Sequence, residues 1–134
     1  MTKHVRISLL AVSVFALLAV ATAQAKPARV ATTVTVTAGK PSEFGFKLST
    51  KTVKTGSVTF NVTNSGTVPH DFRVCSAPVK NDAANSCVGH GTKLLSPGQS
   101  AKLTVNFTKA GTYEYLCTVP GHAIGGMKGV LKVT

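Results

Sequence analysis

Hydrophobic and polar residues alternate along most of the chain after Val30, and this period of two predicts short strands rather than helices. Residues rich in Gly, Pro, Asn and Ser separate the alternating segments, as expected for turns. Seven segments show the pattern most clearly: residues 34–36, 44–48, 58–62, 72–74, 103–107, 113–115 and 130–133. Seven or eight strands at this spacing favour an all-β fold with two packed sheets. The one long connection runs from Ser76 to Leu95.

The N-terminal 25 residues differ in composition from the rest of the chain. A basic start precedes an apolar stretch from Ile7 to about Ala23, and Ala23-Gln24-Ala25 has the small-x-small form of a cleavage site. These features predict a secretory signal peptide over residues 1–25 and one exported domain over residues 26–134. The alternative is an uncleaved membrane anchor, because the apolar stretch is only slightly shorter than a bilayer span. We expect a periplasmic or secreted protein without stable membrane insertion after cleavage.

The chain is strongly basic, with 15 Lys and Arg against 4 Asp and Glu and a formal net charge of +11. Loss of residues 1–25 removes Lys3 and Arg6 and no acid, which leaves a net charge of +9. The basic residues are spread singly and no nucleic-acid motif accompanies them, so a solvated cationic surface is favoured over nucleic-acid binding. Such a surface favours acidic protein partners through long-range attraction. We expect a monomer that binds no nucleic acid.

The candidate chemistry lies in the segment from Tyr113 to Gly129. It presents a thiol, an imidazole and a thioether at equal spacing, in Cys117, His122 and Met127. Pro and Gly residues between them allow the chain to curl, so that the three side chains can converge. A soft thiolate with two imidazoles and a weak axial thioether is the ligand set of a blue-copper site.

The second imidazole must come from elsewhere in the chain. His70 follows a predicted strand and a Gly-containing turn, which would place it at a neighbouring strand end. Taken singly, Cys117 is more often a buried thiol, Met127 core filler and His70 a hydrogen-bonded surface residue. Together, in a Pro/Gly loop after an aromatic strand and with an upstream histidine, they predict one mononuclear copper site. Its ligands are His70, Cys117, His122 and Met127.

The segment from Gly111 to Val133 resembles the C-terminal copper-binding segment of the plastocyanin/azurin-like cupredoxins, and His70-Asp71-Phe72 resembles their upstream ligand segment. The resemblance implies a Greek-key β-sandwich, a type 1 copper ion and one-electron transfer without substrate turnover. Four residues separate Cys117 from His122, whereas the plant-type plastocyanin pattern has two. This longer loop is more similar to those of auracyanin and rusticyanin.

The resemblance also implies an electron port. In this family the histidine that corresponds to His122 reaches the surface through an apolar patch. Pro120, Ala123 and Ile124 are the candidates for that patch here, with lysines such as Lys128 around it.

One contact around the ligands can also be predicted. Asp71, next to His70, could accept a hydrogen bond from the backbone or hydroxyl of Thr118 and so tie the two ligand segments together. The alternative, which the sequence leaves equally open, is that Asp71 is a turn residue without this contact.

The remaining cysteines form a natural pair. With Cys117 on copper, Cys75 and Cys87 are left, and an exported chain is expected to join them in a disulfide. Two unpaired thiols are the alternative. His90 lies in the same connection without a motif around it, and we expect it at the surface.

Three classes of function could use a copper site of this kind. A diffusible one-electron carrier, which is not an enzyme, fits a single copper site. Proteins for copper storage, delivery or resistance usually multiply Met and His ligands, whereas residues 26–134 contain one Met and three His. Copper oxidases need His-x-His clusters, which the sequence lacks. A hydrolase that used Cys117 would need an adjacent base, and its neighbours Leu116 and Thr118 offer none. The sequence therefore favours an electron carrier with redox protein partners.

Overall fold

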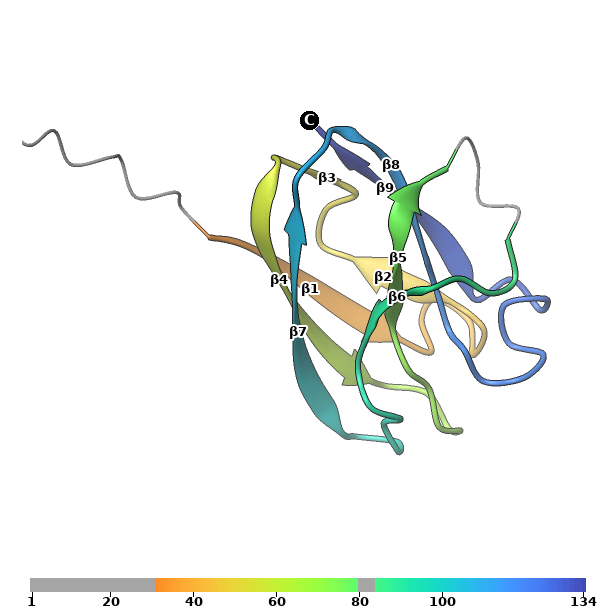
Figure 1. Cartoon of the computed structure of the whole chain (residues 1–134). Coiled ribbons are helices and arrows are strands. Elements are labelled where there is room, and N and C mark those ends of the chain that lie inside the picture. Colours follow the sequence, from red (N-terminus) through yellow and green to blue (C-terminus); the bar gives the residue numbers. More distant parts are fainter. Residues whose placement is uncertain (1–30, 80–83) are drawn as a thin grey trace, which may run out of the picture.

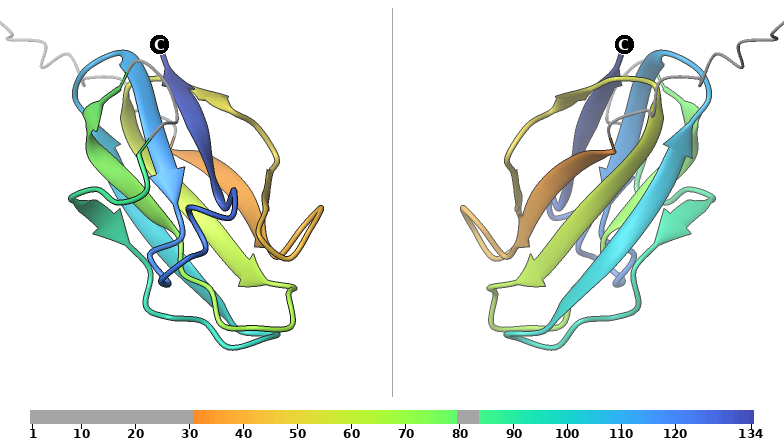
Figure 2. Two further views of the ribbon diagram at one scale, coloured as in Figure 1. Left: turned by 90° about the vertical axis from the view of Figure 1, so that its right-hand side faces the viewer. Right: turned by 90° about the vertical axis from the view of Figure 1, so that its left-hand side faces the viewer.

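The computed structural model describes residues 31–79 and 84–134, which form two β-sheets packed face to face (Figures 1 and 2). The predicted signal peptide, residues 1–25, lies outside the described residues. Within the described part the structure contains nine strands: β1 (Thr32–Ala38), β2 (Phe46–Leu48), β3 (Thr52–Val53), β4 (Gly56–Asn64), β5 (Arg73–Pro78), β6 (Gly89–Gly91), β7 (Ser100–Phe107), β8 (Gly111–Leu116) and β9 (Lys128–Val133). No helix of these residues could cross a membrane.

One sheet has the strand order β2-β1-β4-β7, and the other has the order β3-β9-β8-β5-β6. β1 pairs with β4 and β3 pairs with β9 in parallel, while the other neighbours are antiparallel. The predicted all-β sandwich is confirmed. β3 and β6 were not predicted, because two or three residues are too short to show a period of two.

The space between the sheets is filled by the apolar residues of the alternating segments. Val34 and Val36 on β1 and Phe60 on β4 are fully buried, while their strand neighbours face outward. The ring of Phe72 packs against Phe60, with 5.3 Å between centroids, and against Phe46, at 5.2 Å. Each such side chain contributes roughly 1.5–3 kcal/mol when it leaves water.

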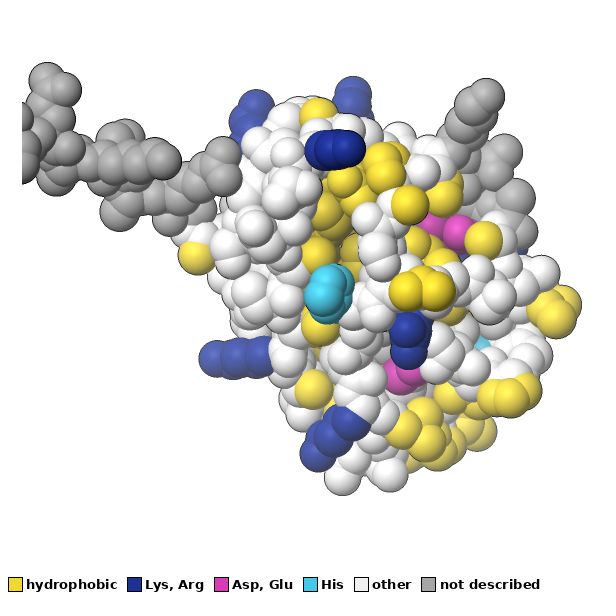
Figure 3. All heavy atoms as spheres, viewed as in Figure 1, with side chains coloured by type: hydrophobic (Ala, Val, Ile, Leu, Met, Phe, Trp, Pro, Cys, Tyr) yellow, Lys and Arg dark blue, Asp and Glu magenta, His cyan; other side chains and the backbone are white. Residues whose placement is uncertain are grey.

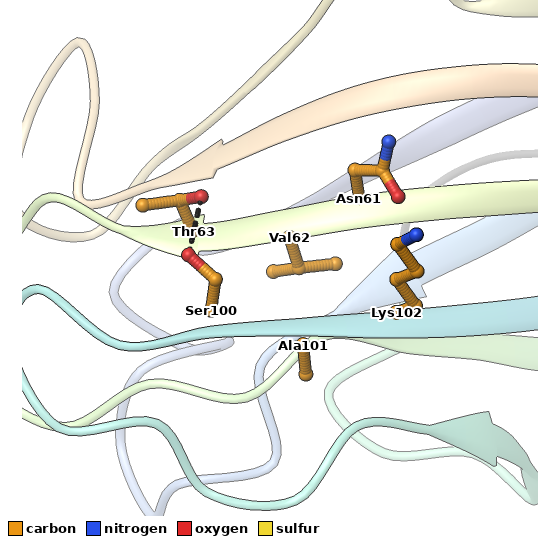
Figure 4. A pocket seen from close by; sticks show the side chains of 6 residues that line it. All are labelled: Asn61, Val62, Thr63, Ser100, Ala101 and Lys102. Atoms are coloured by element: carbon orange, nitrogen blue, oxygen red, sulfur yellow. Dashed lines mark hydrogen bonds between the residues drawn. The ribbon is translucent and has the colours of Figure 1, made fainter.

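The outer face of β4 and β7 carries a shallow depression of about 390 Å³, shown in Figure 4. Its polar lining side chains lie along two neighbouring strands, and the hydroxyls of Thr63 and Ser100 bond to each other at 2.8 Å. The depression contains no cysteine, histidine or acid, so it offers no donors for a metal ion.

The outer face of β8 is covered by the connection that follows β5. Leu116 is fully buried there and packs with Cys75 and Ala123, beside Cys87. A disulfide joins Cys75 to Cys87 across this connection, with 5.5 Å between Cα atoms, which confirms the predicted pairing. The bridge therefore fixes a connection whose described residues between β5 and β6 form no strand.

The segment from Phe44 to Leu48 differs from its prediction as one continuous strand. The strand begins only at Phe46, because the preceding residues form a turn in which the backbone N–H of Gly39 donates to the carbonyl of Gly45 at 2.9 Å. Phe44 consequently sits on this turn with 43% of its surface exposed. An alternating pattern alone does not show where a turn interrupts it.

Candidate metal centre

The predicted ligands lie at one end of the sandwich, where β4 and β8 end and β9 begins. The loop after β4 is organised by the buried side chain of Asn64. Its amide nitrogen donates to the carbonyls of Val68 and Leu95, both at 2.8 Å, and its oxygen accepts from the N–H of Gly66 at 2.9 Å. This network fixes the loop that leads to His70.

His70 is fully buried and is held by its own backbone as well. Its N–H donates to the carbonyl of Leu95 at 3.0 Å, and its carbonyl accepts from the N–H of Leu95 at 2.8 Å. The residue therefore enters the site from a short bridge between two loops rather than from a long strand.

The loop between β8 and β9 is closed by hydrogen bonds between the predicted ligands. The N–H of Cys117 donates to the carbonyl of Met127 at 3.0 Å, and the N–H of Met127 donates to the carbonyl of His122 at 2.9 Å. Gly121 and Gly126 have φ angles of 85° and 104°, which only glycine adopts readily. The glycines thus allow the tight curl that the sequence suggested.

Three donor atoms converge at this end. The Nδ1 atoms of His70 and His122 lie 3.2 Å apart, and the Sγ of Cys117 lies 3.5 Å from the Nδ1 of His122. The three donor atoms all lie within 4.8 Å of one another. Met127 is fully buried in the same core cluster as Cys117, and its carbonyl accepts from the Cys117 N–H. One thiol, two imidazoles and a neighbouring thioether match the donor set of type 1 copper.

Burial shifts the pKa values of two of these groups. The pKa of the Cys117 thiol is raised to about 11, chiefly because burial disfavours the thiolate. The pKa of His122 is lowered, first by desolvation and then by the neighbouring His70. A metal ion binds neutral imidazole and thiolate. The site thus holds the imidazole of His122 in its binding form, and Cys117 must release a proton when a metal binds.

Asp71 links the two segments that carry the ligands. It is 6% exposed, and its Oδ1 accepts from the N–H of Thr118 at 2.6 Å while its Oδ2 accepts from the Thr118 hydroxyl. Asp71 follows His70 and Thr118 follows Cys117, so these bonds hold one predicted ligand beside the other.

Sequence analysis missed the acid that contacts His70. The Nε2 of His70 lies 2.8 Å from the Oε1 of Glu43, on the turn between β1 and β2. This hydrogen bond is the main reason why the pKa of Glu43 falls to about 2. Glu43 stands 27 residues before His70 with no motif around it, and the one signal that sets it apart in the sequence is that the chain has only four acidic residues.

The surface over the site is apolar. The ring of Phe44 packs against the partly exposed ring of His122, with 4.9 Å between centroids. Ile124 is 76% exposed in the ligand loop, and Val68 and Leu94 are exposed in the loops on either side of the His70 bridge. Figure 3 shows hydrophobic side chains at the lower right of the molecule, where Figure 1 places the loop between β8 and β9, and a second group over its upper middle, with single Lys and Arg side chains around them.

The three candidates for the apolar patch have different positions. Pro120 and Ile124 are exposed, but Ala123 is only 3% exposed because it packs under the loop against Leu116 and the disulfide. Ala123 therefore adds no surface to the patch, and Phe44 takes that place.

Two other side chains have defined positions. The ammonium of Lys128 donates to the carbonyl of Ala84 and the side-chain oxygen of Asn85, both at 3.2 Å, so it is directed to the disulfide-closed connection. His90 is exposed on β6, outside the cluster of donor atoms.

Comparisons with known proteins agree with this site. The model of the plastocyanin/azurin family of copper-binding proteins matches residues 32–134. Auracyanin-B of Chloroflexus aurantiacus is 49% identical over 32% of this chain and 18% of its own length. The copper-resistant cuproprotein CopI of Rubrivivax gelatinosus is 34% identical over 66% of this chain and 59% of its own length. The chain thus spans less than two-thirds of the curated relatives that it matches.

Solved structures give the same result. A structure of auracyanin B superposes with a TM-score of 0.61 at 27% identity, over 78% of this chain and 89% of that one. Rusticyanin from Thiobacillus ferrooxidans gives a TM-score of 0.57 at 27% identity, over 76% of each chain. Both agree with the likeness expected from the ligand-loop spacing. The chain belongs to the plastocyanin/azurin family of copper-binding proteins, and its cofactor is a single type 1 copper ion.

Proposed function

We propose that this chain is an exported one-electron carrier and not an enzyme, and that His70, Cys117, His122 and Met127 hold its copper. The convergence of one thiol and two imidazoles within 4.8 Å, with His70 and Cys117 buried and His122 partly exposed, carries the proposal. Copper in such a site supplies one-electron chemistry by cycling between its cupric and cuprous forms. The contribution of the protein residues is to hold the donor atoms in fixed positions.

The rigidity of the metal site supports the proposed role of the chain as an electron carrier. The backbone bonds of the ligand loop, the Asn64 network and the Asp71–Thr118 contact fix the donors through the fold itself. Donors that are fixed by the protein need little rearrangement when the charge of the metal changes, and a small rearrangement favours fast electron transfer.

The partial exposure of His122 supports the proposal that electrons enter and leave the site through this residue. Its ring is partly exposed, while His70 and Cys117 are fully buried. Around it lie the exposed side chains of Phe44 and Ile124. A small apolar contact suits a partner that must leave after each transfer.

The positive net charge of the chain supports an acidic redox protein as its partner. Beyond the proposed signal peptide the chain has a net charge of +9, and Lys40 and Lys93 are exposed in loops at the ligand end. Their field attracts an acidic redox protein and raises its association rate, with less effect on affinity. We propose a monomer that meets such partners in the periplasm or outside the cell, where the disulfide Cys75–Cys87 is stable.

Copper resistance is a second candidate, because the name of CopI describes that protein as a copper-resistant cuproprotein. The two functions differ in what the surface must do. A carrier needs the apolar patch around His122 to exchange electrons, whereas a protein that only sequesters copper does not.

Stopped-flow electron transfer with one acidic and one basic redox protein, across a salt series, tests the carrier. Rates with the acidic partner should fall as salt rises, and rates with the basic partner should rise, because salt screens the field. Ile124→Lys should slow transfer with both, since it places a charge in the apolar contact. Val88→Lys is the matched control, because Val88 is 86% exposed on the disulfide-closed connection. Equal rates for both variants and wild type would exclude an electron port at His122.

A further inference from the structure

Two consecutive residues on one turn contact the two histidines of the metal centre. Glu43 bonds to the Nε2 of His70 at 2.8 Å, and the ring of Phe44 lies 4.9 Å from that of His122. The turn connects β1 to β2, far in sequence from both histidines. It therefore reaches the site from outside the two ligand segments.

The Glu43 carboxylate makes several bonds besides the one to His70. It accepts from the N–H of Thr67 at 2.9 and 3.0 Å, from the Thr67 hydroxyl at 3.0 Å and from the N–H of Val68 at 3.2 Å. Thr67 and Val68 belong to the loop that leads into His70. One carboxylate thus holds both the imidazole and the backbone that presents it.

A glycine makes this approach possible. A Cβ atom on Gly66 would lie 2.3 Å from the Oε1 of Glu43 and 2.8 Å from the Nε2 of His70, which is too close for any side chain. The loop before His70 is therefore shaped to admit the Glu43 carboxylate.

An exposed ion pair of this kind usually contributes little. Two observations distinguish this one. The His70 side chain is 0% exposed, although that of Glu43 is 31% exposed, and the carboxylate accepts from three groups of the neighbouring loop as well. Hydrogen bonds to a charged acceptor are about twice as strong as neutral ones.

The bond also determines which nitrogen of His70 can bind a metal. A carboxylate can only accept, so the Nε2 of His70 carries the proton and its Nδ1 keeps a lone pair. That Nδ1 faces the Nδ1 of His122 at 3.2 Å. Glu43 touches the opposite side of the ring and lies outside the cluster of donor atoms, so it orients a ligand and is not one.

We propose that Glu43 and Phe44 form a positioning clamp on the two copper-ligand histidines, in which Glu43 fixes the tautomer of His70 and favours the cupric form, and Phe44 fixes the ring of His122. The proposal rests on the copper site proposed above. A carboxylate bonded to a ligand imidazole makes that imidazole a stronger donor, and partners of this kind typically change metal affinity by about 10–100-fold. The effect is larger on the more highly charged cupric ion.

Reduction potentials of the copper-loaded full chain test the charge of Glu43. Glu43→Gln keeps an acceptor oxygen and removes the charge. If it weakens cupric binding about tenfold and leaves cuprous binding unchanged, the potential rises by about 59 mV. Ser57→Lys is the matched control, because it makes the same change in net charge on an exposed position of β4. An unchanged potential in Glu43→Gln, or an equal shift in Ser57→Lys, would overturn the role of Glu43.

Nitrogen NMR of the metal-free chain tests the clamp without copper. The wild-type His70 ring should carry its proton on Nε2, and Glu43→Ala should give a mixture of tautomers while Glu43→Gln keeps the wild-type form. Phe44→Ala should increase the motion of the His122 ring, whereas Leu94→Ala, at another exposed apolar position of the same end, should not. A proton on Nδ1 of wild-type His70, or unchanged His122 motion in Phe44→Ala, refutes the clamp. A wild-type chain that binds no copper would instead refute the proposed function.

Discussion

The interior between the sheets and the ligand end of the sandwich are both buried, but they are buried by different means. In the interior, Phe60 and Val36 contact other apolar groups, and their packing has no required direction. At the ligand end, Asn64, His70 and Asp71 are buried polar residues, and each has hydrogen-bond partners at defined distances. The interior therefore accounts for most of the stability of the fold, whereas the hydrogen bonds at the ligand end determine where the donor atoms of the site lie.

This difference predicts that stability and copper chemistry can be changed separately. Substitutions in the interior should lower the free energy of unfolding and leave the site intact in the molecules that stay folded. Substitutions at the ligand end should change the site with a smaller effect on unfolding. The following predictions test that separation, from the largest expected effect on unfolding to the smallest.

Phe60→Ala should have the largest effect. Phe60 is fully buried against Phe72 and Phe107, so its truncation leaves a cavity and should lower the free energy of unfolding by about 3–5 kcal/mol. Urea unfolding of the metal-free protein measures this, with Thr59→Ala on the outer face as the control. The visible spectrum of the folded, copper-loaded variant should equal that of wild type, and a lost or shifted band would show that the two regions are not separable.

Removal of the disulfide should have the next largest effect. Cys75 and Cys87 are 12 residues apart, and by the chain-entropy model a bridge across such a loop contributes about 3 kcal/mol. The double variant Cys75→Ser, Cys87→Ser should therefore lower the unfolding midpoint in urea and keep the copper spectrum. An unchanged midpoint would mean that the covering connection is held by other contacts, such as those of Lys128.

Asp71→Ala should destabilise the ligand end itself. It removes the acceptor of two bonds from Thr118, and the loss of a charged acceptor costs about 1.5–3 kcal/mol. Because Thr118 is exposed, water can take part of the place of the carboxylate, so we expect the total loss to stay below that of the disulfide. Asp71→Asn keeps one carbonyl oxygen as acceptor and should cost less. Both the unfolding midpoint and the copper affinity should fall in Asp71→Ala. A variant that loses stability but keeps wild-type copper affinity would argue against a tie between the two ligand segments.

Met127→Leu should have the smallest effect on unfolding. The two side chains have similar volumes, so this buried substitution should cost less than about 1.5 kcal/mol. Loss of the thioether should keep the blue colour and raise the reduction potential, because a weak axial ligand tunes the copper. Cyclic voltammetry measures the potential, and an unchanged value would remove Met127 from the proposed ligand set.

The same difference explains what the sequence could predict. Alternation identified the long strands and therefore the two-sheet fold, because burial on one face leaves a period of two in segments such as residues 58–62. Cys117, His122 and Met127 could be found because they are close in sequence and because their residue types together are rare outside copper sites. His70 could be identified because the predicted site requires a second imidazole.

Other contacts of the ligand end leave no sequence pattern. Glu43 and Asn64 act through hydrogen bonds to residues that are distant in sequence, such as His70 and Leu95, and a single polar residue shows no period. Ala123 is a candidate for the apolar patch only because the resemblance implies apolar residues around His122, but in the folded loop Ala123 is 3% exposed while the adjacent Ile124 is 76% exposed. Phe44 is predicted in a strand because residues 44–48 alternate, but the strand begins only at Phe46. Loop geometry therefore has to come from the structure.

The visible absorption spectrum of the copper-loaded chain tests the central claim most directly, because only a copper–thiolate bond in a type 1 geometry gives the intense blue band. Wild type loaded with cupric ion should show this band, and Cys117→Ser should lose it while remaining folded, since Cys117 supplies the thiolate. A wild-type protein that binds cupric ion without the band, or a Cys117→Ser variant that keeps it, would contradict the proposed copper site.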